Sequence, residues 1–182
     1  MNKLTFLGTG TSQGVPVIAC ECDVCQSTDF RDKRLRNAAL LEIENSVIAI
    51  DCGPDFRQQM LREKVKKLDA ILITHEHNDH VIGLDDIRSF NFRAQKDMPI
   101  FANENTAKAL QERFRYIFAK NPYPGSPSVN LTTLHKDEKF TVEGLEFMPV
   151  EVMHGKLPIL GFRWKDFAYI TDIKTIDEEE IE

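Results

Sequence analysis

Residues 74–80 read Thr-His-Glu-His-Asn-Asp-His and directly follow the apolar run 70–73. Within six consecutive positions, the imidazoles of His75, His77 and His80 stand together with the carboxylate of Asp79. Imidazole and carboxylate both bind zinc and manganese, and the two side-chain types together can hold a pair of ions. The chain has only five histidines, so three of them in one short loop indicate a metal site.

Further candidate ligands stand at the ends of apolar runs elsewhere in the chain. His154 and Asp172 each follow a run that reads as a strand, and so does Asp51. Strands that end at one edge of a sheet bring such side chains together on a rigid scaffold. We therefore expect His154 and Asp172 near the histidine loop.

Apolar patterning predicts the elements that position these residues. The runs that read as strands are 4–7, 38–43, 47–50, 70–73, 99–102, 129–134, 139–142, 145–153, 159–164 and 167–170. Residues 55–64 predict a helix with Asp55 at its N-cap, and Asn103 or Asn105 can cap a second helix that runs to about residue 119. Strands outnumber helices, and hairpins alternate with helical crossovers. This order favours an α/β fold with mixed sheets.

The composition is that of an ordinary globular protein. The chain has 182 residues, of which 42% are hydrophobic and 29% charged, and it fits one domain over residues 1–182. Its net charge of -6 argues against a broad basic face for nucleic acid. The sequence contains no apolar run of about 18 residues, so it does not predict a membrane-spanning helix. Glycines at positions 8 and 10 come too early for the apolar core of a signal peptide, so we expect a cytoplasmic protein.

Five features, in order along the chain, make it resemble the metallo-β-lactamase-fold hydrolases. They are the loop Gly8-Thr9-Gly10, Asp51 after a strand, the motif at 75–80, His154 and Asp172. The resemblance covers the whole chain and implies an αββα sandwich of mixed sheets flanked by helices. It also implies two divalent ions, zinc or manganese, at the active site of a hydrolase.

The resemblance gives each matching residue a role. The ligands that it implies are His75, His77 and His154 for one ion, Asp79 and His80 for the other, and Asp172 as a bridge between them. Asp51 would orient the histidine loop without touching metal, as partners of ligands commonly do. The expected nucleophile is a metal-bound hydroxide, with which Asp79 would share a proton.

The family also uses a last histidine, well after the bridging aspartate, on the second ion. This sequence has none, because His135 lies before His154 and reads as a surface loop residue. Residues 177–182 read as the first turn of a helix, capped by Thr175 or Asp177. We therefore expect the C-terminal strands and helices of the fold to be missing, as in a truncated form of a longer protein.

Cys20, Cys22 and Cys25 place three thiols within six residues. Thiolates at this spacing favour a structural zinc ion, which needs a fourth ligand; a redox-active or purely structural loop is the alternative. Cys52 reads as a small core residue. The cysteines and the loop 8–16 resemble the phosphoribosyl 1,2-cyclic phosphate phosphodiesterases, which complete such a zinc site with a late histidine.

The subfamily resemblance implies a phosphodiesterase that acts on a small, cyclic phosphodiester. Lys156, Arg57 and Arg88 are the candidate cations for its phosphate, because each lies near a metal-binding loop in the sequence. Nucleic acid is not the expected partner. The apolar, aromatic stretches 90–92 and 116–118 are candidates for a homodimer contact. The alternative is that they pack in the core of the protein.

Three rival functions stay open. The first is a tRNA 3′-processing endonuclease, for which the cations and aromatics of residues 113–120 could grip nucleic acid. The second is a thioester or lactone hydrolase, because a fold alone does not separate acyl from phosphoryl substrates. The third is an inactive fragment with partial metal occupancy, since an incomplete ligand set makes a weaker site.

Overall fold

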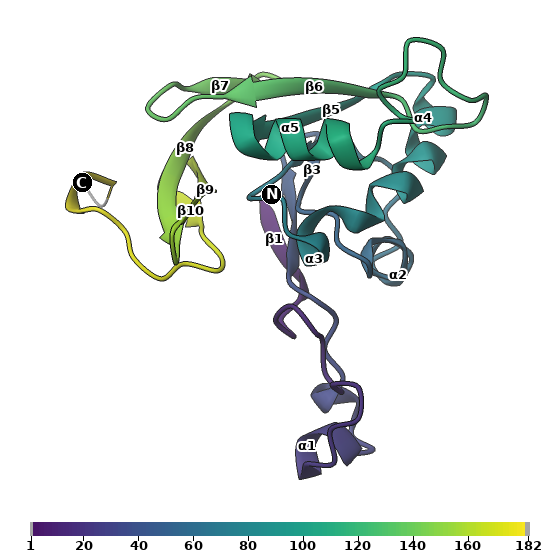
Figure 1. Cartoon of the computed structure of the whole chain (residues 1–182), viewed down its shortest axis with the longest axis vertical. Coiled ribbons are helices and arrows are strands. Elements are labelled where there is room, and N and C mark those ends of the chain that lie inside the picture. Colours follow the sequence, from purple (N-terminus) through teal and green to yellow (C-terminus); the bar gives the residue numbers. More distant parts are fainter. Residues whose placement is uncertain (1, 181–182) are drawn as a thin grey trace.

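The computed structural model describes residues 2–180, in which two β-sheets face each other and helices cover the outer side of the larger one (Figure 1). The larger sheet has six strands in chain order: β1 (Lys3–Gly8), β2 (Ala38–Ile43), β3 (Ser46–Ile50), β4 (Ala70–Leu72), β5 (Met98–Asn103) and β6 (Val129–Leu134). The strands β1 to β3 pair antiparallel, and β3 to β6 pair parallel. The predicted hairpin and the predicted mixed sheet are therefore confirmed.

The smaller sheet is antiparallel throughout, in the order β10-β9-β8-β7. Its strands are β7 (Phe140–Val142), β8 (Leu145–His154), β9 (Leu157–Trp164) and β10 (Phe167–Tyr169). Two-residue turns join the neighbours. In the first of them Glu143 and Gly144 both have positive φ, which a type I′ hairpin turn requires. Tight turns fix the register, so the end of β8 and the end of β10 take defined positions.

The helices are α1 (Asp23–Gln26), α2 (Phe56–Arg62), α3 (Asn78–Val81), α4 (Arg88–Ala94) and α5 (Glu104–Arg113). Short 3₁₀ turns add η1 (Phe30–Asp32), η2 (Ile82–Ile87) and η3 (Glu178–Glu180). Helices α2, α4 and α5 pack on the larger sheet. Within residues 2–180 only η3 follows the smaller sheet, so three layers of the expected αββα sandwich are described. No helix in this part of the chain is long and apolar enough to span a membrane.

Alternation along the central strands builds two separate cores. In β4 and just beyond it, Ile71 and Ile73 pack under the helices, while Ala70 and Leu72 pack between the two sheets. Successive strand residues point to opposite faces, and both faces of this sheet are covered. This is why the central strands read as continuous apolar runs instead of alternating ones.

The second predicted helix, α5, is shorter in the structure than the sequence pattern predicts. α5 begins as expected, since the side chain of Asn103 accepts a hydrogen bond of 2.8 Å from the backbone N–H of Thr106. It ends at Arg113 instead of about residue 119, because Phe114 leaves the helical conformation. Arg113 donates a hydrogen bond of 2.6 Å to the carbonyl of Glu76, which ties this helix end to the histidine loop.

Two predicted caps differ in the structure. Asp55 precedes α2, but its carboxylate makes no cap and accepts hydrogen bonds from Arg36 instead. Because Arg36 is a charged partner close by, it competes with the helix N–H groups for those oxygens. The helical turn expected at 177–182 is a 3₁₀ turn over Glu178–Glu180, and residues 181–182 lie outside the described residues.

Candidate metal-binding active site

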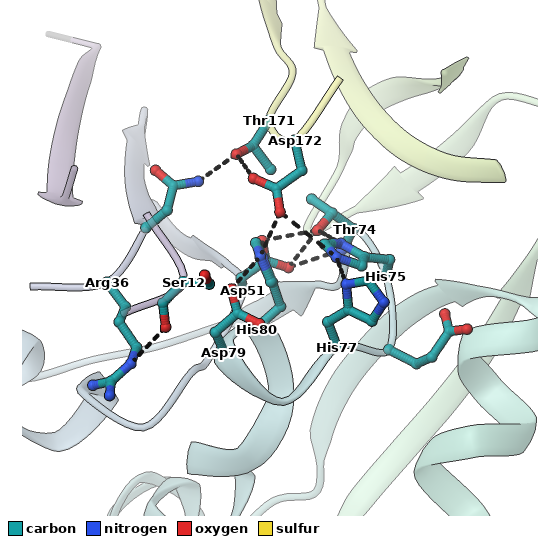
Figure 2. A network of polar contacts seen from close by, with 12 residues as sticks. Ser12, Arg36, Asp51, Thr74, His75, His77, Asp79, His80, Thr171 and Asp172 are labelled. Atoms are coloured by element: carbon teal, nitrogen blue, oxygen red, sulfur yellow. Dashed lines mark hydrogen bonds and ion pairs between the residues drawn. The ribbon is translucent and has the colours of Figure 1, made fainter. Parts of the chain in front are cut away.

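The candidate site lies where strands of the two sheets end beside each other. Asp51 follows β3, the histidine loop follows β4, His154 is the last residue of β8, and Asp172 comes shortly after β10. Figure 2 shows Asp172 reaching toward the histidine loop from the opposite side. The structure thus brings together the residues that the sequence singled out at separate strand ends.

The histidine rings are close enough to share a cation. His75 Nε2 lies 3.0 Å from His77 Nδ1, and the ring of His154 lies 5.6 Å from that of His75 and 5.3 Å from that of His77, between centroids. One ligand atom from each of these rings lies within 4.8 Å of the others. Nitrogen lone pairs at this spacing repel each other unless a proton or a metal ion lies between them.

A second ligand group adjoins the first. His75, His80 and Asp172 also bring one ligand atom each within 4.8 Å of one another. His80 Nε2 lies 3.2 Å from a carboxylate oxygen of Asp172 and 3.2 Å from one of Asp79. Imidazoles with two carboxylates form a donor set that suits a divalent ion, so the residues present fit the two ions that the resemblance implies.

Asp51 orients the loop from the interior. Its side chain is fully buried and accepts hydrogen bonds from the backbone N–H of Thr74 at 2.8 Å and from the Thr74 hydroxyl. The other carboxylate oxygen lies 2.7 Å from His80 Nδ1. This contact leaves His80 Nε2 directed at the cluster, which is the position of a partner that orients a ligand.

A second support comes from the opposite sheet. The hydroxyl of Thr171 donates to Asp172 Oδ1 at 3.0 Å. The amide of Asn37 in turn donates to Thr171 Oγ1 at 2.5 Å and to Tyr169 Oη at 3.0 Å. Asn37, Thr171 and Thr74 were not predicted from the sequence, since each is polar but stands outside the metal motif. Thr171 and Thr74 carry a sequence signal, because each stands next to a candidate ligand, Asp172 and His75 respectively.

The electrostatics of the cluster follow from burial and from its carboxylates. Burial, and then the charge of His80, lower the pKa of His75 to about 4. Burial alone would lower the pKa of His80 as well, but the carboxylates of Asp51, Asp172 and Asp79 outweigh it and raise that pKa to about 10. The hydrogen bond from His80 holds the pKa of Asp172 well below its usual range. The cluster is therefore an anionic environment that attracts a cation.

A cavity of about 520 Å³, lined mainly by polar residue types, opens onto the cluster. Its lining residues are Thr11, Ser12, His77, Asp79, His154, Asp172, Ile173 and Lys174. The glycine-rich loop before Ser12 is held in place because Arg36 Nε donates to the carbonyl of Ser12 at 3.0 Å. A Cβ at Gly10 would lie 2.5 Å from the carbonyl of Arg34, so this loop needs glycine there.

The three cations that the sequence suggested lie elsewhere. Lys156 is exposed in the turn between β8 and β9 and does not line this cavity. Arg57 lines a different cavity of about 340 Å³ beside α2. Arg88 pairs with Asp85 at 3.4 Å. The lysine that does line the cavity is Lys174, which the sequence did not single out.

The family model of the Beta-lactamase superfamily domain matches residues 47–182. The chain belongs to the beta-lactamase superfamily. Among solved structures, this superfamily member is similar to a diphosphatase from the PhnP family, with a TM-score of 0.89 and 41% identity over 100% of this chain and 69% of that one. The predicted metallo-β-lactamase fold is thus confirmed.

Two curated relatives of this chain carry names that describe two different activities. An octanoyltransferase of Porphyromonas gingivalis is 46% identical over 99% of this superfamily member and 36% of its own length. A ribonuclease Z of Listeria innocua is 30% identical over 77% of this chain and 43% of its own length. The chain therefore spans well under half of the length of these relatives. Their names describe proteins of which it matches only a part.

The three clustered cysteines of this superfamily member form a second candidate metal site, on the arm around α1 that extends away from the sheets (Figure 1). Cys20 Sγ lies 3.4 Å from Cys22 Sγ, and the backbone N–H of Val17 donates to Cys25 Sγ at 3.3 Å. A hydrogen bond from the backbone of Cys25 lowers the pKa of Cys22, which favours the thiolate that binds metal. Cys52 is buried in the core, as predicted, and burial raises its pKa.

Proposed function

We propose that this protein is a metal-dependent phosphodiesterase that hydrolyses a small, cyclic phosphodiester. The observation that supports the proposal most is the convergence of histidine and aspartate side chains from separate strand ends on one polar cavity. Such a constellation is the basis of metal-assisted hydrolysis. The 41% identity to a PhnP-family diphosphatase and the similarity to a ribonuclease Z both favour phosphorus chemistry.

In this proposal two divalent ions, zinc or manganese, occupy the cluster. His75, His77 and His154 would hold one ion, Asp79 and His80 would hold the other, and Asp172 would serve both. When bound, such ions polarise a phosphoryl oxygen and lower the pKa of a bound water. A structural zinc ion at Cys20, Cys22 and Cys25 belongs to the same proposal, because the three thiols face one another.

Asp79 is the residue that we assign to proton transfer. Its side chain is 18% exposed, lines the cavity and lies within 3.2 Å of His80, so it reaches both the substrate space and the cluster. A carboxylate oxygen of Asp79 would accept the proton of the attacking water. Asp51 and Thr171 serve this step by orienting His80 and Asp172.

A small substrate is favoured over nucleic acid. The net charge is -6, and among the residues that line the cavity Lys174 is the cation. Within residues 113–120, Arg113 is bonded to Glu76 and Phe114 and Ile117 are buried, which leaves Arg115, Tyr116 and Lys120 exposed. The endonuclease therefore ranks second, supported by the identity to ribonuclease Z.

An acyl substrate ranks third. The octanoyltransferase relative points to acyl chemistry, but a long acyl chain needs an apolar pocket. Ile173 is the apolar side chain among the residues that line this cavity.

A homodimer contact stays a prediction. Of the aromatic residues in the two candidate stretches, Phe92 and Tyr116 are 57% and 43% exposed and could take part in it, while Phe90 and Phe118 pack on the core.

Hydrolysis of bis(p-nitrophenyl) phosphate by manganese- or zinc-loaded protein tests the proposal. Turnover of this phosphodiester, with none of a p-nitrophenyl thioester and none of a precursor tRNA at low salt, is the expected result. Asp79→Asn should lower kcat by about 10²- to 10⁴-fold, because proton transfer loses its base. Asp137→Asn, in an exposed loop, is the matched control and should leave kcat unchanged.

Other outcomes discriminate among the rivals. Cleavage of precursor tRNA alone would favour the endonuclease, and turnover of the thioester alone would favour the acyl hydrolase. Metal binding below one equivalent per chain, with no turnover of any substrate, would identify the inactive form instead.

A further inference from the structure

Lys174 occupies a fixed place beside the metal cluster. Its backbone N–H donates to the carbonyl of Met153 at 2.8 Å, and the N–H of Met153 donates to the carbonyl of Thr175 at 2.9 Å. Met153 immediately precedes the candidate ligand His154. The segment after Asp172 is thus bridged to the end of β8, which places Lys174 on the wall of the cavity that His154 also lines.

The ammonium group of Lys174 is available to a ligand. The two carboxylates that share its cavity are engaged with the cluster, since Asp79 and Asp172 each contact His80 at 3.2 Å. Asp172 also accepts the hydroxyl of Thr171. Among residues 2–180 no ion pair includes Lys174. A lysine that borders a polar cavity without a carboxylate partner is placed to bind an anion that enters it.

The opposite side of the same cavity adds hydroxyl donors. Thr11 and Ser12 line it from the N-terminal loop, which Arg36 and Asp55 hold in place. Thr11, Ser12 and Lys174 are all exposed. By contrast, His75 and His80 are buried, with exposed fractions of 0% and 1%. The cavity therefore presents the imidazoles of His77 and His154 and the carboxylates of Asp79 and Asp172, with hydroxyl and ammonium donors for an oxyanion beside them.

We propose that Lys174, with the hydroxyl groups of Thr11 and Ser12, binds a phosphoryl oxygen of the substrate at the rim of the cavity and so sets the affinity for phosphate-containing substrates. The inference rests on the proposed phosphodiesterase function and goes beyond it by naming the residues that hold the anion. It assigns to Lys174 the role that sequence position alone suggested for Lys156. Both lysines stand two residues after a candidate ligand, so they make a matched pair for a test.

The experiment measures phosphate binding separately from turnover. Isothermal calorimetry of the manganese- or zinc-loaded full chain gives its affinity for inorganic phosphate, and the hydrolysis of bis(p-nitrophenyl) phosphate gives KM and kcat. Lys174→Met keeps the length of the side chain and removes its charge. We expect phosphate to bind about 10-fold more weakly and KM to rise by a similar factor, because one charge-assisted hydrogen bond is lost. The value of kcat should change less than about twofold, since uniform binding is lost.

Two further variants keep the result interpretable. Lys174→Arg retains the charge and should restore most of the phosphate affinity, and Lys156→Met should match the unaltered protein. Metal content, measured by plasma mass spectrometry, should be the same in all of them. Unchanged phosphate affinity in Lys174→Met, or an equal loss in Lys156→Met, would overturn the inference.

The two proposals fail in different ways. Phosphate binding that depends on Lys174, without turnover of any phosphodiester, would refute the proposed function and leave the anion site standing. Turnover with full metal content and no effect of Lys174→Met would refute the anion site alone.

Discussion

At the scale of single residues, the buried carboxylate of Asp51 is the group that most needs hydrogen-bond partners to compensate for its burial. A fully buried charge is costly unless hydrogen bonds and charged partners compensate for it. Here Thr74 supplies two donors and His80 supplies a third. The same contacts that make this burial tolerable fix the direction of the His80 ring. Stability and ligand geometry at this position therefore depend on one side chain.

We predict that Asp51→Asn weakens metal binding by about 10- to 100-fold, because the amide no longer matches the donors of Thr74 and His80. Competition with a metal-chelating dye measures the affinity. Asp85→Asn is the control: this aspartate pairs with Arg88 at the surface, and its replacement should leave the affinity unchanged. Equal affinity in Asp51→Asn and the control would contradict the orienting role of Asp51.

At the scale of elements, the connection after β3 locks against the helix that carries two candidate ligands. The N–H of Cys52 donates to the carbonyl of His80 at 2.8 Å, and the N–H of Gly83 donates to the carbonyl of Cys52 at 2.9 Å. A Cβ at Gly53 would overlap the carbonyl oxygen of Asp79, far inside contact distance. This close approach sets the depth at which α3 presents Asp79 and His80.

We predict that Gly53→Ala lowers the free energy of unfolding by about 3 kcal/mol or more, because the added methyl group must displace the backbone of α3. It should also abolish metal binding at the histidine cluster. Urea denaturation followed by circular dichroism gives the first quantity and metal analysis the second.

Gly144→Ala separates this overlap from simple backbone strain. Gly144 has a φ of +82°, and a Cβ added there would meet no atom within 4 Å, so its replacement carries the cost of a left-handed residue alone. That cost is about 1–2 kcal/mol. Metal binding should survive in Gly144→Ala. If the two variants behaved alike, the packing of Gly53 on Asp79 would not be what positions α3.

At the scale of the whole molecule, the two sheets meet through a shared core that holds the ligands of one against the ligands of the other. Ile50 and Leu72 of the larger sheet pack with Phe147 and Phe162 of the smaller one. His154 ends a strand of the smaller sheet and Asp172 follows another of its strands, whereas the histidine loop follows a strand of the larger sheet. The active site therefore exists only when the inter-sheet core is formed.

The cysteine arm lies apart from this core, as Figure 1 shows, so the two candidate metal sites should load independently. We predict that Cys22→Ser removes about one equivalent of zinc and leaves about two at the histidine cluster. Plasma mass spectrometry of desalted protein measures both. His77→Ala is the complementary variant, which should lose metal from the cluster and keep the cysteine zinc. Loss of all metal in Cys22→Ser would show that the arm is needed to fold the site.

Sequence patterns alone determined which residue types stand at the strand ends and where most strands run. Apolar periodicity and the density of histidine in residues 74–80 are local properties, so they can be read without a structure. The α/β fold with a mixed sheet, the hairpin at β2 and β3, and the cap at Asn103 rest on such local signals and are confirmed. The αββα sandwich was implied by the family resemblance, and residues 2–180 describe three of its layers. The early end of α5 was not predicted, because the helical spacing of apolar residues continues beyond Phe114, which leaves the helical conformation in the structure.

The tertiary structure decided which side chains serve the ligands. Asn37 reaches Thr171 across 134 positions, a contact that depends on how the two sheets pack. The choice between Lys156 and Lys174 has the same origin. Both follow a candidate ligand by two residues, but a tight turn leaves Lys156 exposed outside the cavity, while the backbone bridge from Met153 to Thr175 places Lys174 on its wall. Local sequence sets strands and turns; long-range hydrogen bonds and sheet packing determine which of their side chains meet.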